Sequence, residues 1–477
     1  MPDLYQELIS LAESDMYPFH MPGHKRNCLS TPLEGAFRCD ITEIDGFDNL
    51  HDEDGIILQA EERANSLYGA DKTYFLVNGS TSGVLSAVSS AVHKGGTVLA
   101  ARASHKSFYH AAYLRDLDIH YLPDNTEKEL NIPGRYSAKD VEKCLTDDVE
   151  AVFITSPTYE GKCSDIRGIA EACHRRGIAL IVDEAHGAHF GFGKEYTDAE
   201  GGFYALPNSA VSEGADLVIH STHKTLPSMT QTALIHVQGN IVDKGLLKRF
   251  LRIYQSSSPS YVLMSSIDLC MKEMEEKGDE FVRNLLKYRN KIQEETASNQ
   301  LVKVLGHDDN EDAAKVVISV KDTSMTGQQL YDILREEYAL QLEMAGEKFA
   351  LAIISGWDTE EGIDRLIRAI NDLEKKAVKE EASSKYGKLV MPSKAMKLSK
   401  AWDSEKEVIR IDEAAGHISG EFINLYPPGT PIIAPGEVFS KEILDTIKTY
   451  LGEGLNVQGI VEDNKGNKEG IICVRQK

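Results

Sequence analysis

His220-Ser221-Thr222-His223-Lys224-Thr225 directly follows the apolar run Asp216–Ile219. A short, β-branched apolar run of this kind is typical of a buried strand. In open α/β sheets, ligands bind at the carboxyl ends of the strands. The sequence therefore predicts that Lys224 lies at the mouth of a sheet, among hydroxyl and imidazole groups.

Strand-like runs recur from about residue 75 to residue 240, and a polar or amphipathic segment separates each run from the next. This alternation is typical of βαβ units around a buried, mostly parallel sheet, so the sequence predicts an α/β fold. The runs are Thr97–Ala101, Ala151–Thr155, Ile178–Val182 and Leu217–His220.

The pattern changes after Tyr261. A long charged segment with helical periodicity comes first, and two strand-like runs then flank a helical one; the segments are Asp268–Thr296, Lys315–Val320, Gln328–Tyr338 and Phe349–Ser355. The Lys/Glu/Ser-rich stretch Lys375–Lys388 reads as a linker or a solvated helix end. We therefore predict a large domain with the N-terminal segment at 1–265, a small α+β domain at 266–385 and a C-terminal α/β tail domain at 386–477.

Composition narrows the class of protein. A net charge of −23 and the lack of a basic stripe argue against binding to nucleic acid. No apolar stretch approaches the ~18 residues that a membrane helix needs, and the N-terminus lacks a signal-peptide pattern, so we expect no membrane association and a cytoplasmic location. The seven cysteines are scattered without C-x-x-C spacing, which argues against disulfides and a zinc cage.

Asp183 ends another apolar run, in Val182-Asp183-Glu184-Ala185-His186-Gly187-Ala188-His189. A carboxylate at a buried strand end needs a cationic partner, and the protonated ring nitrogen of pyridoxal phosphate (PLP) would supply one. Lys224 could hold the aldehyde of the same cofactor as a Schiff base. Taken singly, a helix-capping aspartate and a solvated lysine are the ordinary alternatives.

A candidate phosphate site is Asn78-Gly79-Ser80-Thr81-Ser82-Gly83, between the apolar run Tyr74–Val77 and the helical run Val84–Val92. Small residues and hydroxyls that open a helix aim N–H groups and the helix dipole at an anion. N-capping alone would explain one hydroxyl residue but not the whole cluster.

Two histidine-bearing segments lie outside these motifs. His105, in Arg102–Ser107, follows a strand and could stack on the cofactor ring with its flat face, although a surface histidine is the ordinary alternative. The cluster His20–Lys25 precedes the sheet, and its His24 is a candidate substrate contact.

Together these residues resemble the Orn/Lys/Arg decarboxylase family of fold type I, aspartate-aminotransferase-like PLP enzymes. The resemblance extends from His20-Met21-Pro22-Gly23-His24-Lys25 to Tyr426-Pro427-Pro428-Gly429 and Ala434-Pro435-Gly436-Glu437. It implies a fold type I PLP-dependent transferase-like large domain with Lys224 holding the cofactor, Asp183 at its ring nitrogen and His105 stacked on the ring. It also implies phosphate ligands, namely Ser80, Thr81, Ser221, His223 and, from the neighbouring subunit, Ser256.

The resemblance is to short family members without the N-terminal wing domain, which include arginine decarboxylases. His186 stands among the candidate cofactor contacts, where large members tend to have an aromatic residue. The implied activity is decarboxylation of a basic L-amino acid, arginine ahead of lysine and ornithine, to a polyamine-type amine and carbon dioxide. His223 or Lys224 would return the proton to Cα. A homodimer with a shared active site is the expected minimum assembly.

Glu437 is a candidate partner for the distal cation of the substrate, because two Pro-Gly turns precede it and would fix its backbone. A bidentate carboxylate contact suits a guanidinium better than an ammonium, which favours arginine. The alternative is that Glu437 caps a helix that begins near Ser440.

Other functions are consistent with parts of the sequence. A PLP-dependent aminotransferase or lyase would share most of the motifs. A metal-dependent hydrolase could use Asp183, His186 and His189, but the H-E-x-x-H pattern is missing, and we predict no metal. A helicase-like ATPase would need a G-x-x-x-x-G-K-[ST] loop, which the sequence lacks.

Overall fold

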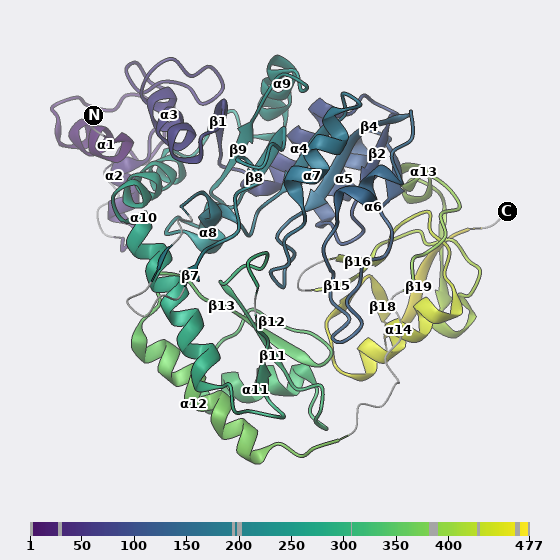
Figure 1. The fold of residues 1–477 in the computed structure, drawn as a ribbon. Coiled ribbons are helices and arrows are strands. Elements are labelled where there is room, and N and C mark those ends of the chain that lie inside the picture. Colours follow the sequence, from purple (N-terminus) through teal and green to yellow (C-terminus); the bar gives the residue numbers. More distant parts are fainter. Residues whose placement is uncertain are drawn as a thin grey trace. The chain divides into compact units, whose positions relative to one another are not determined.

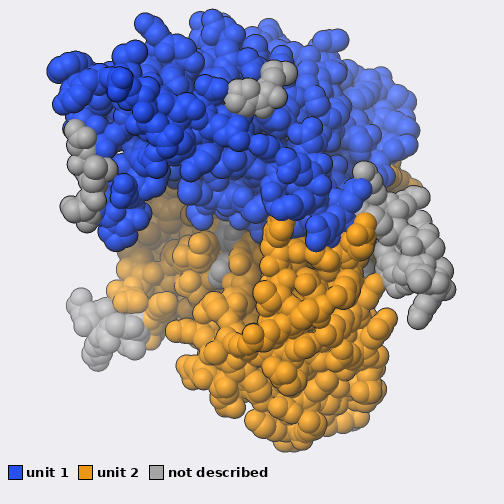
Figure 2. Space-filling view, turned by 90° about the vertical axis from the view of Figure 1, so that its left-hand side faces the viewer, with its two compact units in different colours: residues 1–91, 151–156, 166–282 blue, residues 92–150, 157–165, 283–477 orange. Residues whose placement is uncertain are grey.

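The computed structural model describes residues 3–26, 31–192, 196–197, 203–306, 308–380, 390–426, 430–462 and 468–475. Contacts divide the chain into two compact units, which Figure 2 shows in different colours. Unit 1 comprises residues 1–91, 151–156 and 166–282, and unit 2 comprises residues 92–150, 157–165 and 283–477. The units interleave along the chain, and the three domains with boundaries near 265 and 385 stay a prediction.

Within unit 1, the strands of the main sheet follow the order β1-β9-β8-β5-β4. Strands β4, β5 and β8 are parallel, whereas β9 is antiparallel to both β8 and β1. Figure 1 labels β1, β9, β8 and β4 of this sheet. Their apolar side chains are almost all fully buried, as expected of β-branched strands inside an α/β fold. The bounds are β1 (Lys72–Leu76), β4 (Val149–Thr155), β5 (Ala179–Asp183), β8 (Leu217–His220) and β9 (Ala233–Val237).

Helix α4 (Gly79–Ala91) begins just after β1 and packs closely on the sheet. A Cβ atom on Gly83 would lie 2.6 Å from Leu76 Cδ1 and 3.1 Å from Ile219 Cγ2, so only glycine allows this approach. The N-terminus of α4 is thereby held near the end of β1. The other elements of this part are α1 (Leu4–Glu13), α2 (Glu34–Cys39), α3 (Ile56–Tyr68), α7 (Ile166–His174), η1 (Ala188–Phe192), β6 (Tyr196–Thr197), β7 (Phe203–Tyr204), α8 (Thr222–Thr225), α9 (Lys244–Tyr254) and α10 (Tyr261–Glu295), which ends in unit 2.

Unit 2 contains the parallel pair β2 and β3 and an antiparallel sheet in the order β10-β11-β13-β12. Helix α11 follows β11, so the predicted strand, helix and strand between residues 315 and 355 are confirmed. The bounds are β2 (Thr97–Ala100), α5 (Lys106–Leu114), β3 (Asp118–Tyr121), α6 (Ala138–Glu142), β10 (Lys303–Val304), β11 (Lys315–Ser319), α11 (Gly327–Tyr338), β12 (Met344–Ala345), β13 (Phe349–Ile353) and α12 (Glu360–Lys376).

The C-terminal part of unit 2 builds a small core of its own, which includes Ile433, Phe439, Ile447 and Ile471. Ser440 caps helix α14 by accepting a hydrogen bond from the N–H of Ile443. Residues 381–388 of the expected linker and 427–429 of the Pro-Pro-Gly motif lie outside the described residues. The elements are α13 (Leu398–Trp402), β14 (Lys406–Arg410), η2 (Ile411–Glu413), β15 (Ile423–Leu425), β16 (Thr430–Ile433), α14 (Lys441–Gly452), β17 (Val457–Gln458), β18 (Ile460–Glu462) and β19 (Lys468–Val474).

Two sequence-based expectations concern the chain as a whole. The cysteines in the described ranges all carry free thiols, and Cys28 lies outside those ranges. None of the helices in the described part of the chain combines the length and the apolar character needed to cross a membrane.

Candidate active site

Asp183 and Lys224 come from neighbouring strands of unit 1. Strand β8 runs parallel to β5 with Ile219 opposite Asp183, and Lys224 lies in α8, the single turn after β8. The Ser221 N–H donates to the carbonyl of Ala185 at 3.3 Å and so connects the two loops beyond the strands. The sheet thus brings both predicted residues to the same edge.

The Asp183 carboxylate is only 4% exposed, and its Oδ1 accepts a hydrogen bond from the Ala185 N–H at 3.2 Å. Burial raises the pKa of Asp183, while the positive charge of Lys224 and the Ala185 hydrogen bond lower it. A buried carboxylate of this kind is stabilised by a cationic ligand group.

Lys224 is held by His186. Its Nζ donates a hydrogen bond of 2.9 Å to Nε2 of His186, which places the remaining ring proton of that histidine on Nδ1. His186 is 7% exposed, so this contact is shielded from water. His186 therefore lies beside Lys224, and its predicted contact with the cofactor stays a prediction.

His223 points to a different partner. Its Nδ1–H donates to the carbonyl oxygen of Thr232 at 2.8 Å. Burial lowers the pKa of His223, the hydrogen bond to Thr232 raises it and the charge of Lys224 lowers it again, with a net decrease. The imidazole is therefore neutral near pH 7 and can accept a proton or hydrogen bond at Nε2, but it has no proton there to give.

The candidate phosphate site combines a helix N-terminus with a buried hydroxyl. Ser80 and Thr81 stand in the first turn of α4, where backbone N–H groups have no intrahelical acceptor. The Ser221 side chain is fully buried, and its Oγ has no hydrogen-bond partner among the described residues. Leaving a buried hydroxyl without a partner is costly, so a ligand oxygen at this position suits the site.

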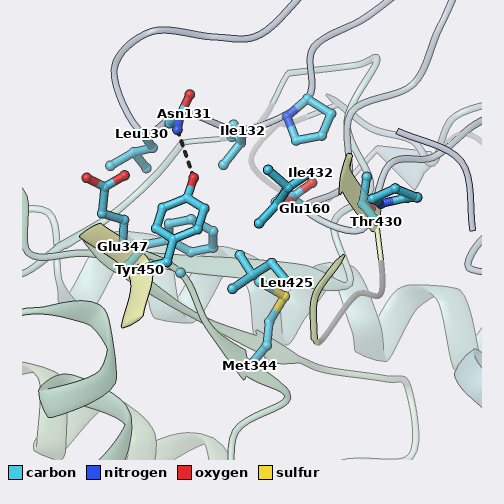
Figure 3. A pocket seen from close by; sticks show the side chains of 14 residues that line it. Leu130, Asn131, Ile132, Glu160, Met344, Glu347, Leu425, Thr430, Ile432 and Tyr450 are labelled. Atoms are coloured by element: carbon cyan, nitrogen blue, oxygen red, sulfur yellow. Dashed lines mark hydrogen bonds between the residues drawn. The ribbon is translucent and has the colours of Figure 1, made fainter. Parts of the chain in front are cut away.

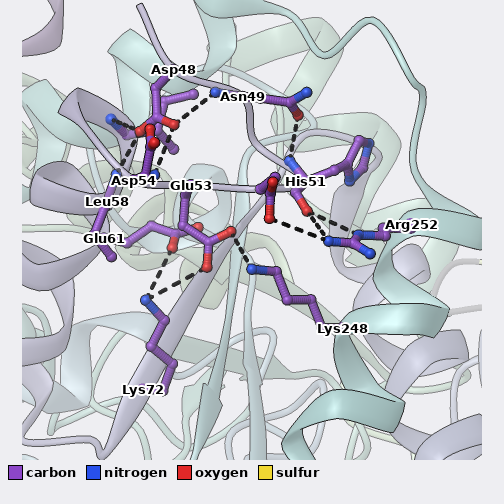
Figure 4. A network of polar contacts seen from close by, with 12 residues as sticks. Asp48, Asn49, His51, Glu53, Asp54, Leu58, Glu61, Lys72, Lys248 and Arg252 are labelled. Carbon is purple, nitrogen blue, oxygen red and sulfur yellow. Dashed lines mark hydrogen bonds and ion pairs between the residues drawn. The ribbon is translucent and has the colours of Figure 1, made fainter.

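Ser256 is exposed and anchored to its own chain. Its N–H points at Asn78 Oδ1 at 3.4 Å, and its carbonyl bonds His51 Nε2 at 2.8 Å. His51 is in turn held by Arg252, whose guanidinium donates to the His51 carbonyl at 2.6 and 2.9 Å (Figure 4). Ser256 therefore adjoins the residues that precede Ser80, and its reach toward a neighbouring subunit stays a prediction.

A hydrogen-bonded row of buried polar side chains lies within the main sheet, and it was not predicted from the sequence. His220 Nε2 lies 2.6 Å from Glu184 Oε2, His236 Nε2 lies 3.0 Å from His220 Nδ1, and Thr73 Oγ1 lies 2.8 Å from His236 Nδ1. Burial lowers the pKa of His220 to about 3, so the ring is neutral. The row connects the ends of β5 and β8 to β9 and β1. A histidine inside the apolar run Ala233–Val237 was the available signal.

His105 and Glu437 lie in unit 2. His105 caps α5, and its Nδ1 accepts the Ser107 N–H at 3.2 Å. Glu437 is 3% exposed and binds Arg102 with both carboxylate oxygens, at 2.6 and 2.9 Å. The alternative that Glu437 caps α14 is wrong, because Ser440 does so. Contact between Glu437 and a substrate cation stays a prediction and would require the Arg102 ion pair to open.

His24 also has protein partners on both ring nitrogens. Its Nε2 lies 3.1 Å from Asp40 Oδ2, and its Nδ1 accepts the Arg26 N–H at 3.0 Å. As a substrate contact it would have to exchange one of these bonds, and that role stays a prediction. Across the described ranges, no group of three or more His, Cys, Asp or Glu residues is arranged to hold a metal ion.

The mixed, mostly parallel sheet with a lysine and an aspartate at its carboxyl edge defines an enzyme of the fold type I PLP-dependent class. The family model described as Orn/Lys/Arg decarboxylase, major domain, matches residues 2–351, and the model of the C-terminal domain matches residues 375–474. The chain belongs to the Orn/Lys/Arg decarboxylase family.

Individual relatives agree with this assignment. An arginine decarboxylase of Bacillus subtilis is 29% identical over 474 residues, which cover 96% of this chain and 95% of that protein. An arginine decarboxylase of Bacillus anthracis is 30% identical, with 96% and 94% covered. A crystal structure of a lysine decarboxylase from Francisella novicida has the same fold, with a TM-score of 0.81 at 19% identity over 100% of this chain and 81% of that one.

Proposed function

We propose that this protein is a PLP-dependent decarboxylase of a basic L-amino acid, with arginine as the first candidate ahead of lysine and ornithine. The observation that carries the proposal is the juxtaposition of Lys224 and Asp183 at adjacent parallel strand ends. Membership in the Orn/Lys/Arg decarboxylase family supports the reaction class. The arginine decarboxylases among the relatives support the order of substrates.

The residues present suit the cofactor. Lys224 offers an amine for the aldehyde, Asp183 offers a buried carboxylate for a protonated ring nitrogen, and the unsatisfied hydroxyl of Ser221 offers a hydrogen bond for a phosphate oxygen. Ser80 and Thr81 at the start of α4 would complete the phosphate site. His105 as the ring-stacking residue remains part of the proposal from family resemblance.

When bound, PLP supplies an electron sink for the electron pair that remains on Cα after carbon dioxide leaves. The Asp183 carboxylate would accept a hydrogen bond from the protonated ring nitrogen and so keep that sink positively charged. The structure favours Lys224 over His223 as the group that returns a proton to Cα. The single N–H of neutral His223 is already donated to Thr232, whereas Lys224 carries its protons at the amine that faces His186.

The test is product identification. The purified, cofactor-loaded protein is incubated separately with arginine, lysine and ornithine, and the products are identified by mass. We expect agmatine and carbon dioxide from arginine at a higher kcat/KM than cadaverine from lysine or putrescine from ornithine. A 2-oxo acid without carbon dioxide would replace decarboxylation by the aminotransferase alternative.

The assembly and location are part of the same proposal. We expect at least a homodimer, since the active sites of the class resembled here are shared between subunits, and a cytoplasmic enzyme. Sedimentation of the purified protein over a range of concentrations would measure the assembly, and a monomer with full activity would contradict it.

A further inference from the structure

Unit 2 contains a cavity of about 100 Å³ that none of the candidate active-site residues lines. Apolar side chains form most of its wall, among them Leu130, Ile132, Met344 and Ile432 (Figure 3). An apolar protein cavity of ~150 Å³ can hold benzene, so this space accommodates a slender chain of a few heavy atoms.

Two carboxylates interrupt this apolar wall. Glu160 and Glu347 are each 8% exposed, and in Figure 3 they lie on opposite sides of Tyr450. Glu160 Oε2 and Glu347 Oε1 are buried and have no hydrogen-bond partner within the described part of the chain. Each carboxylate does have one polar side-chain partner, Thr158 for Glu160 and Asn131 for Glu347. A buried carboxylate oxygen without a partner is still rare, because removing it from water is costly unless another charge or donor replaces the water.

The charged neighbours of Glu160 do not satisfy it. Glu160 faces Lys315 and Glu127, and the Lys315 Nζ lies 3.9 Å from Asp312 Oδ2, so another carboxylate already shares the charge of that lysine. Burial is the largest influence on the Glu160 carboxyl and raises its pKa to about 7.

The neighbours of Glu347 leave the same deficit. Glu347 faces Glu453 and Lys348, and Lys348 donates to the carbonyls of Thr323 and Met325, both at 3.0 Å. Burial and the charge of Glu453 raise the pKa of Glu347 to about 7. Negative charge therefore exceeds positive charge around both glutamates.

We propose that this cavity binds a short aliphatic diamine or amino-guanidine, with the methylene chain on the apolar wall and the cationic ends at Glu160 and Glu347. A divalent metal ion fits poorly, because Ca²⁺ requires six to eight oxygen ligands and the wall is mostly apolar. An amino acid also fits poorly, since its own carboxylate would face two others. The proposal rests on the cavity alone, although the amine product of the proposed reaction belongs to the same chemical class.

Both carboxylates must be ionised to bind a dication. The pKa of each carboxyl is raised to about 7, so near neutral pH the free site is partly protonated. Binding of a dication then releases those protons. The affinity should therefore increase with pH, and we expect it to be at least about tenfold higher at pH 8 than at pH 6.

Titration calorimetry of the cofactor-loaded, full-length protein with putrescine tests the proposal. We expect Glu160→Gln and Glu347→Gln each to weaken binding by at least about tenfold at pH 8, because each removes one charge-assisted contact. Glutamine resembles the protonated carboxyl in shape, so both variants should fold, which thermal unfolding would verify. Glu336→Gln, on the exposed face of α11, is the matched control and should bind like the unchanged chain.

Two further ligands sharpen the test. Butylamine, with one charge, should bind far more weakly than putrescine. Arginine is offered to the Lys224→Ala protein, so that no amine product forms, and should show no binding that the additional glutamine substitutions abolish. Equal affinity of butylamine and putrescine, or unchanged putrescine binding in both glutamine variants, would overturn the proposal. The readout is binding, so its result does not depend on whether the chain decarboxylates any amino acid.

Discussion

Lys224 Nζ lies 2.9 Å from Nε2 of His186, so the lysine ammonium donates a hydrogen bond to a neutral imidazole. A hydrogen bond to a charged group contributes about 1.5–3 kcal/mol to the stability of that charge. His186→Ala should therefore ease the loss of a proton from Lys224. In cofactor-free protein, the pH at which this amine becomes reactive should fall by about one unit, measured by reductive methylation and peptide mass mapping. Lys244 in α9 is an internal reference, and an unchanged midpoint at Lys224 would contradict the contact.

Replacing the Asp183 carboxylate should separate cofactor binding from catalysis. Asp183→Asn keeps the shape of the side chain but removes its charge, so we expect cofactor to remain bound while kcat falls on the order of 100-fold or more. Absorbance of the bound cofactor and steady-state kinetics measure the two effects. Asp52→Asn, on an exposed loop of the same unit, is the control. Near-normal turnover in Asp183→Asn would contradict the assignment of Asp183 as the partner of the cofactor ring nitrogen.

Hybrid oligomers test whether the active site is shared. Lys224→Ala subunits are mixed with Ser256→Tyr subunits, and verified heterodimers are assayed. If Ser256 serves the neighbouring site, one of the two sites in a hybrid is intact and activity should return to roughly half that of one unchanged dimer. If Ser256 serves the site of its own chain, beside Asn78, each hybrid site carries one lesion and no activity returns.

The Glu437 carboxylate should matter more for stability than for substrate affinity. Removing one partner of a buried ion pair typically costs about 3–5 kcal/mol, because the other charge is left buried. Glu437→Ala should therefore lower the unfolding midpoint by several degrees, with KM for arginine little changed in the folded fraction. A large increase in KM with an unchanged midpoint would instead identify Glu437 as the partner of the distal cation.

Glu61 should make stability depend on pH. Burial raises the pKa of Glu61 to about 8, while its Oε1 accepts the Phe75 N–H at 2.9 Å and its Oε2 lies 3.6 Å from Lys72 Nζ (Figure 4). The folded chain holds this proton more tightly than the unfolded chain, so stability falls as pH rises from about 4.5 to about 8. The free energy of unfolding of Glu61→Gln, relative to that of the unchanged chain, should increase between about pH 4.5 and about pH 8. The increase should be on the order of a few kcal/mol at pH 8.5. Urea unfolding at pH 5 and pH 8.5 measures the difference, and a constant difference would contradict it.

The amino-acid sequence alone determined the strands and their chemistry. Apolar β-branched runs that end in Asp183 and before Ser221 predict buried strands, because both the strand tendency and the apolar character of such runs can be read from neighbouring residues. Parallel strands place their carboxyl ends together, so the nearness of Lys224 and Asp183 followed from the same pattern. The hydroxyl-rich start of α4 was likewise a local signal.

Only the tertiary structure decided which side chains already have ion-pair or hydrogen-bond partners within the protein. The partner of Glu437 is Arg102, more than 300 residues away in sequence, and no local pattern indicates that ion pair. The buried connection between Glu184, His220 and His236 also depends on the register of three strands. Glu160 and Glu347, each with one unsatisfied carboxylate oxygen, face one cavity because segments distant in sequence pack around it. Burial and pairing are properties of packing, and packing joins residues that the sequence keeps apart.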